Sequence, residues 1–282
     1  MAVKVMEGMR WGEEFLQEKG VENARYDADL LLAEALGWPR NQLYLDREYD
    51  LSEYQESIFR KGILRRSEHE PLQYILQHQD FMGLPFYIDE RVLIPRADSE
   101  VLVEKWLELV TAESSQEKRK IKVADLCTGS GILAVSMKYY FPLAEVVGTD
   151  ISFDALKVAG LNAERMGVQV EWRQGDFVTP IRGELWDWIV MNPPYVSEEE
   201  YHQCAPEIFF EPSIAFLGGQ DGLDFYRRLA NEIQSLLTPR GKLLMEIGWQ
   251  QAEPICGIFK KSGFETDVFL DLAGRNRVIL AR

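Results

Sequence analysis

The sequence predicts an α/β fold in which a small helical region precedes a mostly parallel sheet. From Ile121 onward, short apolar segments of strand length alternate with longer segments of helical periodicity. Such alternation is typical of a parallel sheet covered by helices on both faces. Before residue 80, by contrast, apolar residues recur at helical spacing alone.

The N-terminal region, residues 1–78, is expected to form a small helical bundle. Apolar side chains recur every three or four residues around positions 30–36 and again over 52–64. The Gly-Trp-Pro sequence at 37–39 breaks the pattern between them, and we expect Pro71 to close the last helix. We interpret this region as a separate N-terminal helical domain, and the family resemblance described below implies that it binds the substrate.

Residues 79–96 change in character and predict a β-hairpin linker. Apolar residues dominate 81–88 and 92–95, and Asp89 with Glu90 separates them. Two short apolar segments around a polar pair are typical of a hairpin with a short turn.

Residues 97–282 are expected to form the larger α/β domain. A helix is predicted over 99–110, and the polar stretch 111–120 is expected to be mobile. The predicted strands are 121–127, 145–150, 168–173, 186–191, 241–247, 264–271 and 276–281. The predicted helices are 131–140, 153–166, 222–237 and 249–262. Because no helix separates the last two strands, they should form an antiparallel hairpin at the sheet edge. The long connection 196–220 is predicted to be a functional lid.

Composition narrows the function classes. The chain has 282 residues, with 31 basic and 46 acidic side chains and a formal net charge of −15. No apolar run reaches the roughly 20 residues of a membrane span, and the N-terminus lacks a signal-peptide pattern. We therefore expect a cytoplasmic protein without membrane association. The three cysteines and three histidines show no ligand spacing, so no metal is predicted.

The sequence Asn192-Pro193-Pro194-Tyr195 follows the apolar run 186–191 and is the most informative motif. An Asn oxygen at the end of a buried strand accepts one N–H of a planar NH2 group, and the Pro193 carbonyl accepts the second. The Tyr195 ring can lie against the same group. The motif predicts methyl transfer to an amide or exocyclic amine nitrogen. The alternative is structural, because Asn-Pro-Pro after a strand is also a common turn.

A second motif predicts a nucleoside site. Cys127-Thr128-Gly129-Ser130-Gly131 joins a strand to a helix, and its glycines permit close approach of a ligand to the backbone. The dinucleotide pattern is not met, since residue 134 is Ala.

Acidic residues at the next two strand ends complete this site. Asp150 ends the second strand, where a carboxylate can accept both ribose hydroxyls, although it could instead cap the following helix. Asp176 offers an acceptor for an adenine amino group, and Phe177 a ring to pack on the base. A nucleoside site without a phosphate-binding motif, beside an NH2-holding motif, implies S-adenosylmethionine. Asn192 would then stand between the cofactor methyl and the target nitrogen.

The motifs together resemble those of the HemK-type protein-(glutamine-N5) methyltransferases. The similarity covers nearly the whole chain, and it includes residues 92–96 with Glu100, 127–131, 192–195, 211–212, 218–227, 246–251 and 271–278. Three departures are Ala97-Asp98-Ser99 in place of Pro-Glu-Thr, Cys127 in place of Gly, and Phe177 in place of Trp. The resemblance implies a Rossmann-like S-adenosylmethionine-dependent methyltransferase domain.

The resemblance also implies the substrate and the site. The substrate is the glutamine of the Gly-Gly-Gln motif in bacterial peptide chain release factors, held by the helical domain. Asn192, Pro193 and Tyr195 are the implied catalytic residues, and Pro194 joins them in binding substrate. The implied cofactor-binding residues are Cys127, Thr128, Gly129, Ser130, Gly131, Asp150, Asp176, Phe177 and Asn192.

Two rival functions differ in class. An adenine-N6 methyltransferase acting on DNA or RNA uses the same motif logic, but a nucleic-acid-reading domain is usually basic. Residues 1–80 carry ten basic and sixteen acidic side chains, a balance of −6. A nucleoside-sensing adaptor would not need Asn192 at a strand end. We therefore expect a protein substrate, no stable nucleic-acid binding and a monomeric enzyme.

Overall fold

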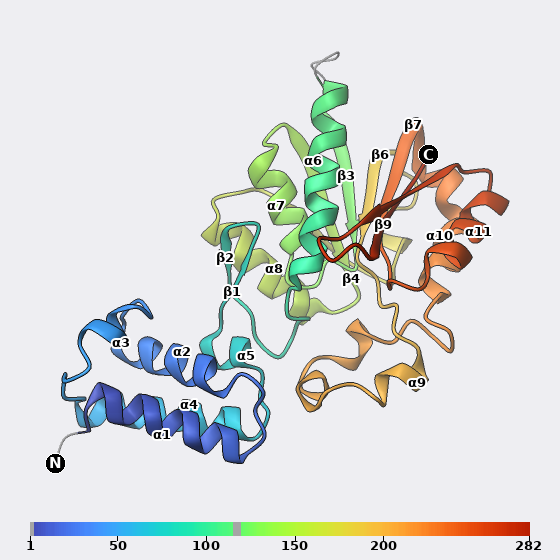
Figure 1. The fold of residues 1–282 in the computed structure, drawn as a ribbon. Helices are drawn as coiled ribbons and strands as arrows, with labels where there is room; N and C mark the ends of the chain where they lie inside the picture. The colour runs from blue at the N-terminus through green and yellow to red at the C-terminus, as the bar shows by residue number, and fades with distance from the viewer. Residues whose placement is uncertain (1–2, 115–119) are drawn as a thin grey trace. The chain divides into compact units, whose positions relative to one another are not determined.

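The computed structural model describes residues 3–114 and 120–282, which form two units (Figure 1). The first unit consists of residues up to His78 together with Ala205–Phe210. The second consists of Gln79–Cys204 and Glu211–Arg282. Within the described residues, no helix is both long and apolar enough to cross a membrane.

The first unit is helical, as the periodicity of its apolar residues predicts. Its helices are α1 (Val5–Glu18), α2 (Ala24–Leu36), α3 (Gln42–Leu45), α4 (Glu53–Ser67) and α5 (Leu72–Leu76). Ser52 caps α4 in a reciprocal box, in which its hydroxyl accepts from Gln55 N at 3.2 Å and Gln55 Oε1 accepts from Ser52 N at 2.9 Å. Leu16, Leu32 and Phe59 are almost completely buried and join α1, α2 and α4 in one core.

One helix boundary differs from the prediction. Helix α4 already ends at Ser67, and Pro71 stands immediately before α5 rather than closing a helix. Proline has no N–H to donate, and its fixed φ suits the first turn of a helix, where no intrahelical acceptor is needed. Pro71 therefore starts the short helix that leads out of the bundle.

A hairpin follows the bundle, but its turn lies earlier than expected. Strands β1 (Gln79–Phe81) and β2 (Leu84–Phe86) pair antiparallel around Met82 and Gly83. The prediction of a turn at Asp89 and Glu90 was wrong. Both turn residues have positive φ, 52° and 70°, as a two-residue turn matched to strand twist requires. Met82 is held in this conformation because its N–H donates to Glu100 Oε1 at 2.6 Å.

The predicted seven-stranded sheet, with its antiparallel C-terminal hairpin, is confirmed. The strand order is β5-β4-β3-β6-β7-β9-β8. Their bounds are β3 (Ile121–Leu126), β4 (Ala144–Asp150), β5 (Glu171–Gln174), β6 (Trp186–Met191), β7 (Leu237–Glu246), β8 (Thr266–Leu270) and β9 (Asn276–Ala281). The first five run parallel, whereas β9 pairs antiparallel with both β7 and β8.

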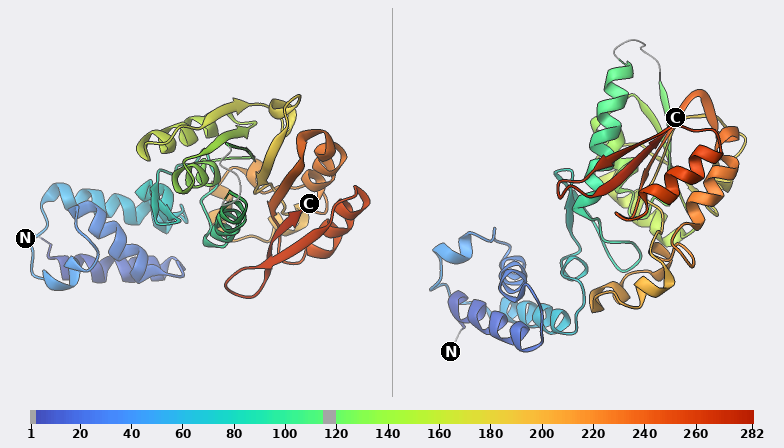
Figure 2. Two further views of the ribbon diagram at one scale, coloured as in Figure 1. Left: turned by 90° about the horizontal axis from the view of Figure 1, so that it is seen from above. Right: turned by 45° about the vertical axis from the view of Figure 1, so that its right-hand side comes forward.

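Helices cover both faces of this sheet. One face carries α6 (Glu100–Ser114), α7 (Ile132–Tyr140) and α8 (Phe153–Arg165), and the other carries α10 (Asp224–Leu236) and α11 (Ala252–Lys261) (Figures 1 and 2). Helix α6 continues four residues beyond the predicted end at Val110, so the first part of the stretch expected to be mobile is helical. The rest of that stretch, except Lys120, lies outside the described residues.

The connection predicted to be a lid contains short elements of its own. These are α9 (Glu198–Tyr201) and the 3-10 helices η3 (Pro206–Phe210) and η4 (Ser213–Ala215). Its base is closed where Val196 N donates to Phe216 O at 2.8 Å and Gly218 N donates to Val196 O at 2.9 Å. The remaining 3-10 helices of the described chain are η1 (Ala97–Ser99) and η2 (Thr179–Ile181).

Candidate functional site

The strand order brings the predicted motifs to one edge of the sheet. Strand β3 lies between two neighbours in the sheet. The next strand along the chain, β4, pairs with one edge of β3, and β6 pairs with the other edge. Leu126 pairs in register with both Met191 and Thr149. The residues that follow these three paired positions, Cys127, Asn192 and Asp150, therefore lie side by side at the switch point, where open α/β sheets bind ligands.

A cavity of about 280 Å³ opens at this edge. Of the predicted cofactor residues, six line it: Cys127, Gly129, Asp150, Asp176, Phe177 and Asn192. Val92, Leu93 and Phe225, from the segments 92–96 and 218–227 that match the family, also line it. Other walls come from residues that the motif analysis did not find, and these include Arg91, Ile214, Ala215 and Arg228. The volume is close to the lower end of the range of small-molecule sites.

Within the loop after β3, Thr128, Ser130 and Gly131 are not among the lining residues. The Thr128 hydroxyl donates to Asp125 Oδ2 at 2.5 Å, and Gly131 packs so closely that an added Cβ would lie 2.9 Å from Ala159 Cβ. These residues shape the loop. Cys127 has a φ of 58°, in the left-handed region that glycine adopts at less cost, so the cysteine at this position is strained.

Asp125, in β3, holds the loop that follows this strand. Its side chain is fully buried, and Oδ2 accepts from Thr128 and from Ala134 N at 3.2 Å. Among the described residues no group donates to its Oδ1. Burial raises the pKa of this carboxyl to about 7, against the opposing effect of its two donors.

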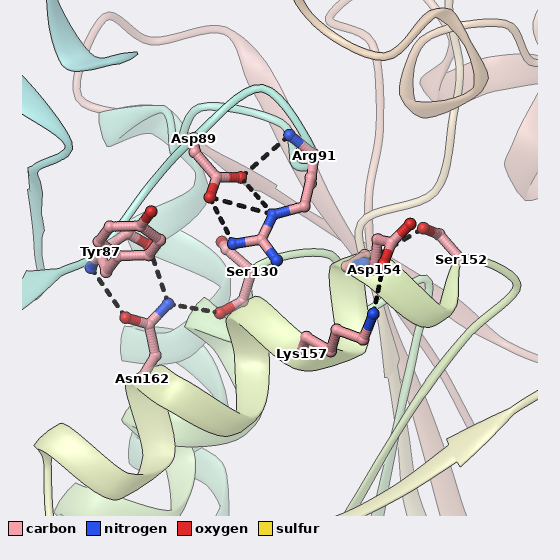
Figure 3. Close-up of polar contacts among 9 residues, drawn as sticks. Tyr87, Asp89, Arg91, Ser130, Ser152, Asp154, Lys157 and Asn162 are labelled. Atoms are coloured by element: carbon pink, nitrogen blue, oxygen red, sulfur yellow. Dashed lines mark hydrogen bonds and ion pairs between the residues drawn. The ribbon is translucent and has the colours of Figure 1, made fainter. Parts of the chain in front are cut away.

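Asn162, which the sequence analysis did not single out, fixes the same loop from α8. Its Nδ2 donates to Ser130 O at 2.9 Å, and its Oδ1 accepts from Tyr87 N at 2.8 Å (Figure 3). The side chain is completely buried. It therefore ties the cavity loop to the segment that follows the hairpin.

Asp150 lines the cavity and is held there by two backbone N–H groups. Its Oδ2 accepts from Gly129 N and its Oδ1 from Ser152 N, both at 2.9 Å. The cap of α8 itself is Ser152, whose hydroxyl accepts from Ala155 N at 3.1 Å. Burial raises the pKa of the Asp150 carboxyl. Each carboxylate oxygen can accept more than one hydrogen bond, so the face of Asp150 toward the cavity can still accept hydroxyl groups.

Asp176 and Phe177 share a partner that the sequence did not reveal. Arg228 Nη2 lies 2.7 Å from Asp176 Oδ2, and the guanidinium stands 5.0 Å from the Phe177 ring centre. Phe225 packs edge-on against Phe177 at 5.1 Å. Two rings, a cation and a carboxylate thus meet at one end of the cavity, where a flat polar base can bind.

Asn192 is held through its NH2 group. Its Nδ2 donates to Ser99 Oγ at 3.2 Å, and none of the described residues donates a hydrogen bond to its Oδ1. The arrangement leaves the amide oxygen as a free acceptor at the end of β6. Such an acceptor on a residue that lines the cavity is what the motif requires.

Pro193 and Pro194 are buried, and Tyr195 packs beside them. Pro194 lines the cavity, whereas Pro193 and Tyr195 are not among its lining residues. The Tyr195 hydroxyl donates to Glu246 Oε1 at 3.2 Å, and Gln251 Nε2 donates to Tyr195 O at 2.9 Å. Burial raises the pKa of the Tyr195 hydroxyl, so it stays protonated and acts as a donor.

Comparison with known proteins identifies relatives of both units. A family model described as the PrmC N-terminal domain matches residues 7–76, and one described as the methyltransferase small domain matches residues 107–223. The release factor glutamine methyltransferase of Geobacter sulfurreducens is 40% identical over 275 residues, covering 96% of this chain and 94% of that protein. Its counterpart from Moorella thermoacetica is 40% identical over 266 residues, covering 93% and 92%.

A solved structure supports the fold alone. A methyltransferase from Pyrococcus furiosus has a TM-score of 0.52 at 17% identity, covering 71% of this chain and 89% of that one. Within the described residues, no group of three or more His, Cys, Asp or Glu side chains could hold a metal ion.

Proposed function

Because the chain belongs to the release factor glutamine methyltransferase family, we propose that it methylates the glutamine of the Gly-Gly-Gln motif in bacterial peptide chain release factors. The acceptor atom is the side-chain amide nitrogen, N5. The reaction depends on S-adenosylmethionine.

The observation that carries the proposal is the state of Asn192. Its NH2 group is occupied by Ser99, while its oxygen has no donor among the described residues. A glutamine amide that enters the site can give one N–H to this oxygen and the other to the Pro193 carbonyl. Since Pro193 has no N–H, it cannot compete as a donor.

The residues around the cavity fit the cofactor. The Asp150 carboxylate lies where a ribose is expected in this fold, and Phe177 with Phe225 offers an apolar wall for the base. Asp176 would accept from an adenine amino group while it remains paired with Arg228. When bound, S-adenosylmethionine would supply a methyl group on a positively charged sulfur. The chain would hold the amide nitrogen that accepts this group, and the proton that the nitrogen loses would pass to water.

The chain contributes position and polarity rather than a strong base. An amide nitrogen is a poor nucleophile because its lone pair is delocalised into the carbonyl. Two fixed acceptors, Asn192 Oδ1 and Pro193 O, draw positive charge toward the N–H groups as the bond forms. They would also orient the nitrogen toward its target, and such orientation can lower a barrier by several kcal/mol.

We further propose that the helical unit binds the release factor and that the enzyme acts as a monomer in the cytoplasm. Its acidic balance suits a protein rather than a nucleic-acid substrate. The separate helical core also supports an independent binding role.

The test is a side-by-side assay with labelled cofactor. Purified release factor, DNA and RNA are each incubated with the enzyme and the labelled cofactor. We expect label on the release factor and none on DNA or RNA. Mass spectrometry should then place the methyl group on the glutamine of the Gly-Gly-Gln motif. Label on adenine instead would establish the N6-adenine alternative and overturn the proposal.

A further inference from the structure

We propose that Glu246 is a positioning residue for methyl transfer: its carboxylate, acting through the hydroxyls of Ser99 and Tyr195, keeps the Asn192 oxygen turned toward the substrate amide. The proposal rests on the proposed function and deepens it. It assigns a task to a buried carboxyl that the motif Asn192–Tyr195 does not include.

Glu246 lies beside the motif because of the sheet register. It is the last residue of β7, and the preceding Met245 pairs with Met191, the last residue of β6. Its side chain is 1% exposed. Oε1 accepts from the Tyr195 hydroxyl at 3.2 Å, whereas Oε2 has no hydrogen-bond partner among the described residues. A buried carboxylate oxygen without a donor is costly and is rarely kept for stability.

The hydrogen-bond directions connect Glu246 to Asn192. Ser99, also 1% exposed, accepts from Asn192 Nδ2, so its own hydrogen must point elsewhere. The Ser99 hydroxyl also acts on the Glu246 carboxyl, where it favours the charged form. A hydrogen bond from the Ser99 hydroxyl to Oε2 would give this oxygen the donor that it lacks, and catalytic contacts often tighten when substrate binds.

The ionised carboxylate favours this arrangement. It accepts from both hydroxyls, so the Ser99 hydrogen points to Glu246 and the Ser99 oxygen accepts from the Asn192 NH2 group. A protonated carboxyl would instead donate to Ser99 or Tyr195 from one of its oxygens, which frees the hydrogen of that hydroxyl for another acceptor. If Ser99 then donated its hydrogen to Asn192, the amide would turn and present NH2 to the substrate.

Burial of the carboxyl, more than any neighbouring charge, places the change between its neutral and ionised forms near neutrality. Burial raises the pKa of Glu246 to about 7, while Arg277 and the hydroxyls of Ser99 and Tyr195 favour ionisation and Asp98 opposes it. Arg277 is itself paired with Asp98 at 2.9 Å and Asp271 at 3.2 Å. On the remaining side, the Tyr226 hydroxyl donates to the Glu246 backbone oxygen at 2.7 Å. The rate of transfer should therefore rise as pH increases through about 7 and level off above it.

The test compares single-turnover rates of the full chain with release factor and saturating S-adenosylmethionine, between about pH 6 and pH 9. Glu246→Gln keeps the size and loses the charge. We expect its rate constant to fall about 10- to 100-fold at pH 8, with cofactor affinity nearly unchanged and the rise through pH 7 abolished. Ser99→Ala should show much of the same loss, and adding Glu246→Gln to it should cost little more.

Asp187→Asn is the matched control. Asp187 is 7% exposed on the neighbouring strand β6, at the opposite end of the sheet, where it accepts from Lys122 N at 3.0 Å. The same change of carboxylate to amide should leave the rate and its pH profile as in the unmodified chain.

Several results would overturn the proposal. One is a Glu246→Gln variant with the normal rate and pH profile, and another is strictly additive losses from Glu246→Gln and Ser99→Ala. If Glu246→Gln does not fold, a rate for the unmodified chain that is constant between pH 6 and 8 contradicts the proposal. Absence of any transfer by the unmodified chain contradicts the proposed function itself, which separates the two failures.

Discussion

At the scale of single residues, the site depends on how each polar side chain divides its hydrogen bonds between the fold and a ligand. The carboxylate of Asp150 accepts from the Gly129 N–H with one oxygen and from the Ser152 N–H with the other, and the residue lines the cavity. Asn192 gives its NH2 group to Ser99 and keeps its oxygen free of donors from the described chain. Preorganisation of this kind lowers the cost of orienting a ligand.

Asp150→Ala should weaken cofactor binding. Hydrogen bonds to a charged group contribute about 1.5–3 kcal/mol each, so affinity for S-adenosylhomocysteine should fall at least about tenfold in a calorimetric titration. Asp154→Ala is the control, because Asp154 is exposed one turn away and pairs with Lys157 at 2.8 Å without lining the cavity. Equal affinities for the two variants would remove Asp150 from the cofactor site.

At the scale of elements, the loop after Asn192 is held by close backbone packing. An added Cβ on Gly222 would lie 2.2 Å from Tyr195 O, and the φ of Gly222 is 73°. Only a glycine fits this approach and this conformation without strain. The segment that follows the long connection thus fixes the backbone of the motif Asn192–Tyr195.

Gly222→Ala should both destabilise the fold and slow methyl transfer. Overpacking and a left-handed alanine together should cost about 2 kcal/mol or more, visible as a lower Tm. Gly257→Ala is a matched control, because Gly257 lies in the interior of α11 with no atom within 4 Å of the added Cβ. Alanine there should leave the Tm unchanged or raise it. A Gly222→Ala variant as stable and active as this control would contradict the packing argument.

Local sequence predicts these elements where the apolar pattern is unambiguous. The runs ending at Asp150 and Met191 form buried strands whose ends were placed correctly, whereas β3 ends at Leu126, one residue before its predicted end. The turn at Met82 was missed, since methionine lacks the usual preference for positive φ and is held there by the tertiary contact with Glu100. Contacts between residues far apart in the chain could not be predicted from the sequence either. Arg228 meets Asp176 across 52 residues, and Ser99 meets Asn192 across 93, because the strand order brings them together.

At the scale of the whole molecule, we propose that the first unit binds the protein substrate and that the second unit carries out methyl transfer. The cavity and the motif Asn192–Tyr195 are built entirely from the second unit, whereas the first has its own apolar core. An ion pair between Arg66 and Glu207, at 3.0 Å, joins that core to Ala205–Phe210 within the first unit.

A soluble fragment that begins at Gln79 should therefore bind cofactor but methylate release factor poorly. Cofactor affinity should stay close to that of the full chain, because every lining residue of the cavity is retained. The KM for release factor should rise strongly, with a smaller effect on a short peptide that contains Gly-Gly-Gln. Equal turnover of intact release factor by fragment and full chain would contradict the binding role of the helical unit.

The central claim is that the Asn192 oxygen holds the substrate amide for attack. Asn192→Ala keeps both prolines and the strand end but removes the acceptor, and Asn192→Asp keeps an acceptor while losing the NH2 group that Ser99 binds. Loss of one preorganised hydrogen-bonding group from a transition state typically costs about 10²–10³ in rate. If only the acceptor matters, the Asp variant retains part of the activity, whereas it is as inactive as the Ala variant if the Ser99 contact is also needed.

The most direct measurement is the single-turnover rate of methyl transfer to release factor by Asn192→Ala at saturating S-adenosylmethionine. We predict a fall of about 10²–10³ with cofactor affinity changed much less. A near-normal rate would contradict the mechanism proposed for this site.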